Sequence, residues 1–265
     1  MRALRSLANG LRLAGYFVRF GLELLIVRPQ TRQARANWLH RFCSSALQGF
    51  SIPVMVEGEF PGRGALISNH LSYLDIVVLA ALHPCVFCAK SEIERWPVIG
   101  WMTAMSGTVF IERGRGGSAL KAKSRMQSAA QAGLPVVFFP EGTTSNGEQL
   151  LPFHSGLLAQ ALLAEMPVTA AYIRYHLDSD NGPDVSVADD VCFWGTVPMI
   201  PHVFRFLGLR GVRATVRFAP SPIDFVSDAK HRKSAAKEAC LAVAALAPQG
   251  DPAAQTTALE SQCLL

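Results

Sequence analysis

Two residues that could perform acid–base chemistry, His70 and Asp75, follow an apolar run that predicts a strand at residues 65–68. On a regular helix, positions five apart lie about 140° apart around the axis, so their side chains would not meet. They can approach if His70 lies in the turn that leaves the strand and Asp75 lies in the first turn of the next helix. A carboxylate on one imidazole nitrogen fixes the tautomer and leaves the other nitrogen free as a base. Asp75 also suits a helix start by itself, so a purely structural pair is the alternative.

Two further segments place polar residues where predicted strands end. Residues 107–113, Gly-Thr-Val-Phe-Ile-Glu-Arg, predict a strand that delivers a charged pair at its end. Residues 138–147 predict a buried strand that breaks at Pro140 and then exposes Glu141 and several hydroxyl groups in a turn, whose backbone N–H groups could face an anion. Because open α/β sheets bind ligands where their strands end, the three segments together predict one site.

Taken together, these motifs resemble those of the glycerophospholipid acyltransferase family. The N-H-x-x-x-x-D motif of that family matches residues 69–75, and its second motif matches residues 107–113. Its F-P-E-G-T motif matches residues 139–143, and a weaker V-P-V-like strand matches Pro167 and Val168. The match to the family is specific because four motifs occur in the family's order and spacing.

The resemblance implies an O-acyltransferase that moves a fatty acyl group from a thioester of acyl carrier protein or coenzyme A to a hydroxyl of a lysolipid. It implies that His70 is the general base and that Asp75 orients it. The residues implied to bind the acceptor are Asn69, Arg113, Glu141, Gly142 and Thr143. It implies no metal ion and no bound cofactor, since the acyl thioester is a co-substrate.

The acceptor implied first, by family frequency, is 1-acyl-sn-glycerol-3-phosphate (lysophosphatidate), which gives phosphatidate. Two positions depart from the phosphatidate-forming pattern, because Thr144 stands where many members have arginine and His154 where a basic residue often precedes Ser155. Both changes weaken the case for a phosphate monoester. Residues 143–147 and 193–202 look more like relatives that acylate lyso-ornithine lipid, so this or another lysolipid is the alternative acceptor.

Two other classes of protein are weighed against an acyltransferase. A lipid hydrolase could pair His70 with Ser68 or Ser72 as nucleophile, but the sequence has no G-x-S-x-G nucleophile elbow. A non-catalytic lipid-binding protein would have no need of a base. The only C-x-x-C pair, residues 85–88, lacks the second pair that a zinc site would require.

Short β-rich runs alternate with helical runs from residue 53 onward, which predicts an α/β fold with a mixed, largely parallel sheet flanked by helices. Strands are expected at residues 54–56, 65–68, 86–89, 108–111, 136–139, 168–172 and 212–218, and helices at 73–82, 119–132, 156–165 and 230–246. We therefore expect an acyltransferase domain over residues 51–246 and a flexible tail over residues 247–265.

The first 41 residues carry the basic charge of the chain, because they hold eight arginines and one acid, a net charge of +7 against +5 for the whole protein. The rest of the chain, after residue 41, carries no excess positive charge, which argues against nucleic acid as a partner. Polar positions recur every three or four residues from Arg2 to Glu23, between largely apolar ones, which predicts an amphipathic helix that Pro29 ends. A second amphipathic run extends to Phe50.

These two helices predict a membrane-interfacial hairpin over residues 1–50, in which the arginines meet anionic lipids. This indicates a peripheral or monotopic protein on the cytoplasmic face of a membrane, as expected for a bacterial inner membrane. Tilted insertion of the first helix, or packing of both helices on the domain core, are the alternatives. The longest charge-free stretches have sixteen residues, short of the roughly 20 that a spanning helix needs.

Overall fold

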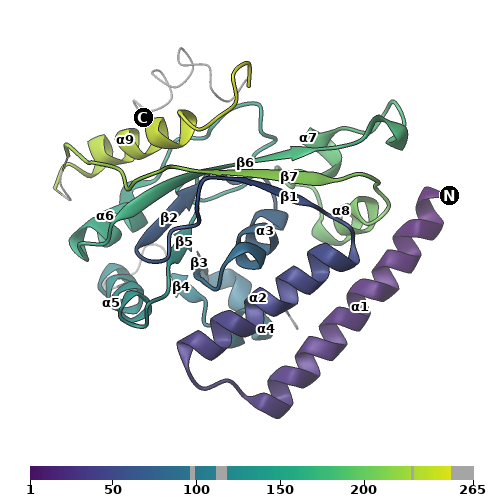
Figure 1. The fold of residues 1–265 in the computed structure, drawn as a ribbon, viewed down its shortest axis with the longest axis horizontal. Coiled ribbons are helices and arrows are strands. Elements are labelled where there is room, and N and C mark those ends of the chain that lie inside the picture. Colours follow the sequence, from purple (N-terminus) through teal and green to yellow (C-terminus); the bar gives the residue numbers. More distant parts are fainter. Residues whose placement is uncertain (96–98, 112–117, 228–229, 252–265) are drawn as a thin grey trace.

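A seven-stranded sheet forms the centre of the computed structural model, which describes residues 1–95, 99–111, 118–227 and 230–251 (Figure 1). The strands lie in the order β1 (Val54–Glu57), β7 (Arg213–Phe218), β6 (Val168–His176), β2 (Ala65–Ser68), β5 (Val136–Phe138), β3 (Val86–Lys90) and β4 (Val109–Ile111). The strands from β6 to β4 run parallel, while β7 is antiparallel to β6 and parallel to β1. The predicted mixed, largely parallel sheet is therefore confirmed.

Helices cover both faces of the sheet, which gives three layers (Figure 1). One face is covered by α5 (Ser118–Gln131), α6 (Ser155–Leu163) and α9 (Arg232–Ala244), and the other by α2 (Arg32–Gly49), α3 (Leu74–Leu82) and α8 (Met199–Phe206). Successive side chains of β2 point to opposite faces, so Ala65 and Ile67 lie in the first core and Leu66 lies in the second.

Three short helices of the described chain were not predicted, namely α4 (Ile99–Met105), α7 (Val187–Asp190) and α8. α8 contains Pro201, which argues against a helix in sequence analysis. Pro201 is the third residue of the helix, where the missing backbone N–H removes no helical hydrogen bond. Strand β6 also continues to His176, beyond the predicted residue 172. Short 3-10 turns occupy Ser91–Arg95 and Ser179–Asn181.

The two N-terminal helices are present, but the second belongs to the core. α1 (Arg2–Val27) ends at Arg28, which has a left-handed φ of 46°. The side chain of Thr31 then caps α2 by accepting a hydrogen bond from the N–H of Ala34 at 3.1 Å. The apolar side of α2 packs inside the protein, with Cys43 and Leu47 against α3 and the sheet. Packing on the core, one of the alternatives from the sequence, is therefore correct for α2.

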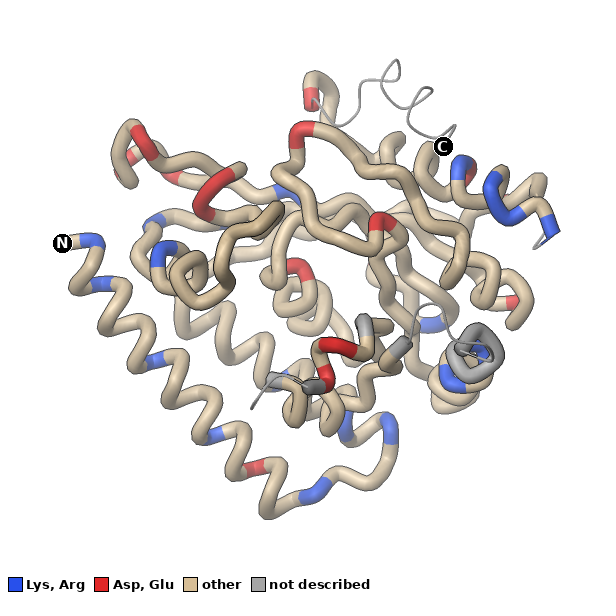
Figure 2. Tube along the Cα trace, turned by 180° about the vertical axis from the view of Figure 1, so that it is seen from behind, with Lys and Arg blue, Asp and Glu red and all other residues tan. Residues whose placement is uncertain are grey.

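The first polar residues of α1 bond to the body of the protein, whereas Arg12 and Arg19 are exposed. Arg2 forms an ion pair with Asp190 at 2.8 Å. Arg5 and Asn9 donate hydrogen bonds to backbone carbonyls just after α8, at 2.7 and 2.8 Å. The expectation that these arginines point to lipid is corrected by the structure, because their partners lie on the body of the protein. Figure 2 shows the basic positions spaced along α1.

The exposed side of α1 is apolar. Its exposed large hydrophobic side chains are Leu4, Leu7, Leu11, Val18, Leu22, Leu25, Ile26 and Val27. The aromatic residues of α1 lie on the inner side, where Phe20 packs against Trp38 and Phe42 of α2. Within the described residues, no helix has both the length and the apolar character needed to cross a membrane.

Candidate active site

The structure brings His70 and Asp75 into contact in the arrangement that the sequence predicts. His70 lies in the loop after β2, and Asp75 lies in the first turn of α3. The Nδ1 atom of His70 is 2.7 Å from Oδ2 of Asp75. Nδ1 therefore carries a proton in this pair and Nε2 is free to accept one. Nε2 has no hydrogen-bond partner among the residues that the structure describes.

The Asp75 carboxylate is fully buried and receives hydrogen bonds on both oxygens. The backbone N–H groups of Leu71 and Ser72 donate to Oδ2 at 2.7 and 3.0 Å. The hydroxyl of Tyr175, on β6, donates to Oδ1 at 2.6 Å. These donors leave neither oxygen of the buried carboxyl group without a hydrogen bond. Burial raises the pKa of Tyr175, and the adjacent Asp75 raises it further, so its hydroxyl remains a donor.

Asn69 joins the catalytic loop to β6. Its side-chain amide donates to the carbonyl of Ile173 at 2.9 Å, and its Oδ1 accepts from the N–H of Ile173 at 2.7 Å. Asn69 is buried, and both of its side-chain polar atoms bond to protein. In this structure Asn69 fixes the backbone that carries His70.

Glu141 joins the loop after β5 to the same segment. Its Oε1 accepts from the N–H of His70 at 2.9 Å, and its Oε2 accepts from the N–H of Leu151 at 3.2 Å. The side chain is 2% exposed. Burial raises the pKa of Glu141 to about 8, assisted by the negative charge of Asp75 and opposed by the two backbone N–H donors.

The turn after β5 also shapes the surroundings of the imidazole. The ring of Phe139 stacks on that of His70, with centroids 3.9 Å apart and planes 7° apart. The N–H of Gly142 donates to the carbonyl of Phe139 at 3.0 Å, and Gly142 has a φ of 65°, a conformation that favours glycine. The next residue, Thr143, is exposed, as is His154 at the start of α6.

The predicted site residues therefore separate into three groups. His70 and Asp75 are in direct contact, and Asn69 and Glu141 hold the backbone beside them. Gly142 and Thr143 lie in the turn that follows Glu141. Arg113 lies outside the described residues. Sequence analysis missed Tyr175, although its position on the same strand as the V-P-V-like match was a signal, since that strand neighbours β2.

The two serines considered as hydrolase nucleophiles are not bonded to His70. Ser68 donates to Oδ1 of Asn69 at 3.1 Å. The hydroxyl of Ser72 is buried, and no described group forms a hydrogen bond with it. The geometry therefore lacks the serine–histidine contact that activates a nucleophile.

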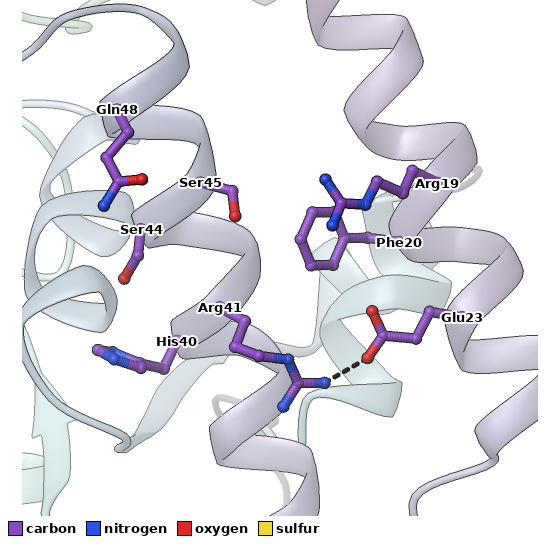
Figure 3. Close-up of a pocket in the computed structure, with 8 residues that line it drawn as sticks. All are labelled: Arg19, Phe20, Glu23, His40, Arg41, Ser44, Ser45 and Gln48. Carbon is purple, nitrogen blue, oxygen red and sulfur yellow. Dashed lines mark hydrogen bonds and ion pairs between the residues drawn. The ribbon is translucent and has the colours of Figure 1, made fainter.

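Two cavities lie near the N-terminal helices and the site. One, of about 230 Å³, lies between α1 and α2, where Arg41 and Glu23 form an ion pair (Figure 3). It is smaller than the ~300 Å³ typical of small ligand pockets. The other, of about 500 Å³, is lined by Asp189, Cys192, Trp194, Gly195, Thr196, Val197 and Arg205. Phe193, which lies between the lining residues Cys192 and Trp194, donates its N–H to the carbonyl of Leu71, next to His70, at 2.8 Å.

The His70–Asp75 pair lies where parallel strands end and is bonded to neither Ser68 nor Ser72, an arrangement in which the imidazole can accept a proton from a substrate. The chain belongs to the family described as Acyltransferase, whose sequence pattern matches residues 52–174. It is similar to the lyso-ornithine lipid O-acyltransferase of Pseudomonas aeruginosa, with 37% identity over 217 residues, 81% of this chain and 79% of the relative. The family resemblance seen in the motifs is therefore confirmed.

A second relative supports the same assignment, and a solved structure shows a similar fold. The 1-acyl-sn-glycerol-3-phosphate acyltransferase of Neisseria gonorrhoeae is 37% identical over 145 residues, 53% of this chain and 57% of that protein. The crystal structure of the 1-acyl-sn-glycerophosphate acyltransferase PlsC from Thermotoga maritima has a TM-score of 0.61 at 20% identity, covering 89% of this chain and 93% of that one. This structural similarity shows that the fold is shared.

Proposed function

We propose that the protein is a lysolipid O-acyltransferase that moves a fatty acyl group from an acyl thioester to a hydroxyl of a membrane lysolipid. The observation that carries the proposal is the His70–Asp75 contact, in which Nδ1 is engaged by a buried carboxylate and Nε2 is free. Membership of the Acyltransferase family and the names of the relatives support the reaction class.

In the proposed reaction, Nε2 of His70 removes the proton of the acceptor hydroxyl as its oxygen attacks the thioester carbonyl. The carbon–sulfur bond breaks when the tetrahedral intermediate collapses, and the thiol leaves with the proton from His70. Asp75 stabilises the imidazolium that forms between these steps. General-base catalysis of this kind contributes about 10²–10⁴ in rate, and positioning of the two substrates contributes further.

For the acceptor, lyso-ornithine lipid takes precedence over lysophosphatidate in this proposal. Thr144 replaces the arginine common in phosphatidate-forming members, and the lyso-ornithine relative aligns over more of the chain than the lysophosphatidate one. Thr143, which is exposed, and Arg113, which lies outside the described residues, are proposed to contact the acceptor head group, and Gly142 to shape the turn beside it. The donor is proposed to be a thioester of acyl carrier protein or coenzyme A.

We also propose that α1 binds the protein to one leaflet of a membrane, as a peripheral protein. The exposed row of aliphatic side chains on α1 supports this, because such a face is unfavourable in water and suits the lipid interface. The arginines of α1 contribute mainly by holding the helix on the protein, since several are engaged with backbone carbonyls.

The test of the catalytic proposal offers purified protein an acyl thioester and a panel of lysolipids, with the product identified by mass. His70→Ala should lower kcat at least 10²-fold, the lower end of the contribution of a general base. His83→Ala, which removes a histidine at the end of α3, is the matched control and should leave kcat unchanged. Acyl transfer by His70→Ala at the wild-type rate would contradict the proposed base, and release of free fatty acid alone would indicate a hydrolase.

A further inference from the structure

The segment that joins β6 to β7 lies at the edge of the sheet that carries His70. β6 and β7 are antiparallel neighbours, so the chain between them begins and ends at the carboxyl end of β6. β6 is parallel to β2, whose carboxyl end leads into the loop with His70. The cavity of about 500 Å³, which we call the α7–α8 cavity, is lined by residues of this segment from Asp189 to Arg205. It therefore lies at the same edge of the sheet as the proposed base.

Hydrogen bonds hold the wall of the α7–α8 cavity against the catalytic loop. The N–H of Phe193 donates to the carbonyl of Leu71 at 2.8 Å. Nε2 of His202 is 2.8 Å from the carbonyl oxygen of Cys192, and its Nδ1 is 3.2 Å from the hydroxyl of Tyr73. The ring of Tyr73 also lies 5.7 Å from that of Phe193. The wall is thus bonded to the segment that connects the proposed base to α3.

The thiol of Cys192 shows how near the cavity is to the catalytic pair. Cys192 lines the cavity and is buried. Burial raises its pKa to about 12, and the negative charges of Asp75 and Asp189 raise it further. One side chain therefore lies near both the carboxyl group that holds the imidazole and the carboxyl group of the cavity.

The α7–α8 cavity presents one acidic and one basic side chain. Asp189 lies in α7 and Arg205 lies in the last turn of α8, and both are exposed. Oδ2 of Asp189 accepts a hydrogen bond from the hydroxyl of Ser186 at 2.8 Å. The guanidinium of Arg205 has no hydrogen bond or ion pair with any residue that the structure describes. A ligand that carries one charge of each sign would match both side chains.

Trp194 adds an aromatic ring beside the acid. Its ring N–H donates to the carbonyl of Ala188, the residue before Asp189, at 2.9 Å. An indole ring attracts an ammonium group to its face, and a carboxylate attracts the same group. The guanidinium of Arg205 suits a carboxylate, with which it can form two parallel hydrogen bonds. The two ends of the cavity lining therefore have complementary preferences.

We propose that the α7–α8 cavity binds the zwitterionic head group of an N-acylated diamino acid, with Asp189 at the ammonium group and Arg205 at the carboxylate. The inference rests on the proposed function and names the residues that select the acceptor. An ornithine head group that is joined to its acyl chain through the α-amino group keeps one carboxylate and one side-chain ammonium. The free hydroxyl of such a lipid is only a few bonds away, so head group and hydroxyl occupy neighbouring parts of one site.

The same charges disfavour a phosphate monoester in this cavity. The formal charges of Asp189 and Arg205 cancel, whereas a phosphate monoester carries about −1.5 to −2 at pH 7. Repulsion from Asp189 would therefore act against lysophosphatidate, and repulsion of this kind is a usual source of specificity. The volume of about 500 Å³ is within the range of roughly 300–1,000 Å³ that is typical of ligand sites.

The test measures acyl transfer to lyso-ornithine lipid by Asp189→Asn and Arg205→Gln. In each variant KM for the acceptor should rise about tenfold with little change in kcat, because a hydrogen bond to a charged group far from the reacting atoms is lost. The matched controls are Asp184→Asn and Arg210→Gln, which neutralise exposed residues of the same segment that do not line the cavity. Both controls should retain wild-type KM, and urea midpoints check that all four variants are folded.

Modified acceptors identify which charge each residue binds. On an acceptor whose side-chain amine is acetylated, Asp189→Asn should cause no further loss, and on one whose carboxylate is a carboxamide, Arg205→Gln should cause no further loss. On lysophosphatidate, Asp189→Asn should raise kcat/KM, because a repulsive charge is removed. Equal losses on every acceptor would overturn the inference, since the side chains would then serve the fold and not the head group.

Two further outcomes separate this inference from the proposed function. A rise in KM for the acyl thioester, with KM for the acceptor unchanged, would overturn the inference and assign the cavity to the donor. A wild type that transfers no acyl group to any lysolipid would refute the proposed function alone. Calorimetry with a short-chain N-acylornithine would then still test the cavity, because binding should weaken about tenfold in Asp189→Asn and stay unchanged in Asp184→Asn.

Discussion

At the scale of single residues, the site depends on one carboxyl group that is buried inside the protein and hydrogen-bonded on both oxygens. Asp75 is completely buried, yet it accepts hydrogen bonds from two backbone N–H groups, an imidazole and a phenol. With this many partners, neither of its oxygens is left unsatisfied in the interior. Asp75 therefore holds the imidazole at Nδ1, and the ring of Phe139 stacks on its face. Both restraints limit the rotation of His70 before substrate binds.

Tyr175→Phe tests the contribution of the phenol. Removing its hydroxyl leaves Oδ1 of Asp75 buried without this donor, a loss of roughly 1–3 kcal/mol. We expect most of this free-energy loss to fall on the transition state, so kcat should fall about tenfold while KM changes little. Tyr172→Phe is the matched control, because Tyr172 is on the same strand and its hydroxyl bonds to Asp251 instead. A rise in KM with unchanged kcat would show that Tyr175 serves binding and not the orientation of the base.

Glu141 predicts a pH dependence of stability. The unfolded chain releases this carboxyl proton near pH 4.5, whereas the folded protein keeps it until about pH 8, because burial raises the pKa. The contribution of Glu141 to the free energy of unfolding is therefore largest below pH 4.5 and declines as pH rises to about 8.

The measurement is the difference in urea midpoint between wild type and Glu141→Gln. The urea midpoint of the wild type should fall relative to that of Glu141→Gln between pH 4.5 and about 8. At higher pH the difference should stay constant. A constant difference across this range would mean that Glu141 is already ionised in the folded protein at low pH.

At the scale of elements, the site is assembled by three neighbouring parallel strands. β2 lies between β5 and β6, so the loop with His70 follows one strand, the turn with Glu141 follows the next, and Tyr175 lies on the third. Asn69 and Glu141 then fasten the central loop to each neighbour. The position of His70 therefore depends on the register of β2 against β5 and β6, because β2 leads directly into the loop that carries His70.

Gly64→Ala tests this dependence on register. Gly64 directly precedes β2 with a φ of 86°, and a Cβ there would lie 2.3 Å from the carbonyl oxygen of Pro167. We expect a loss of about 1–3 kcal/mol in stability and a lower kcat, because β2 must move away from β6. Gly62→Ala, in the same loop, would place its Cβ in open space and serves as the control. Equal stability of the two variants by urea denaturation would show that the loop can absorb the added methyl group.

At the scale of the whole molecule, α1 leaves a row of aliphatic side chains exposed along one edge of the protein. Core packing encloses the aromatic residues between α1 and α2, while the aliphatic row of α1 remains outside. A deletion of residues 1–50 would remove α2, which is part of the core, and would unfold the domain. Point substitutions on the exposed row of α1 are therefore the appropriate test of membrane binding.

Leu7→Asp combined with Leu11→Asp should lower partition into vesicles by more than tenfold, because both side chains are exposed in water and are proposed to enter the lipid interface. Gln30→Asp combined with Gln33→Asp makes the same change in charge at exposed positions near the other end of the hairpin. That control should retain most of its binding in a sedimentation assay. Equal losses in both double variants would indicate that charge, and not the apolar row, governs binding.

The sequence by itself determined the order of the strands and of the longer helices, and the pairing of His70 with Asp75. Those features are local, because alternating apolar runs and a five-residue spacing across a strand–helix turn depend only on neighbouring residues. The motif residues from Asn69 to Thr143 were identified by their resemblance to the family's motifs, which also implied that Asn69 and Glu141 bind the substrate. In the described structure both side chains bond to backbone groups, and their contact with substrate stays a prediction.

Only the tertiary structure decided which long-range partners complete the site and which side of each helix is exposed. The contact from Tyr175 to Asp75 spans 100 residues and requires β6 to lie beside β2. The orientation of α1 depends on carbonyl groups after α8, a helix that the sequence did not indicate. An amphipathic pattern defines two faces of a helix, but which face turns inward depends on the partners that the rest of the fold supplies.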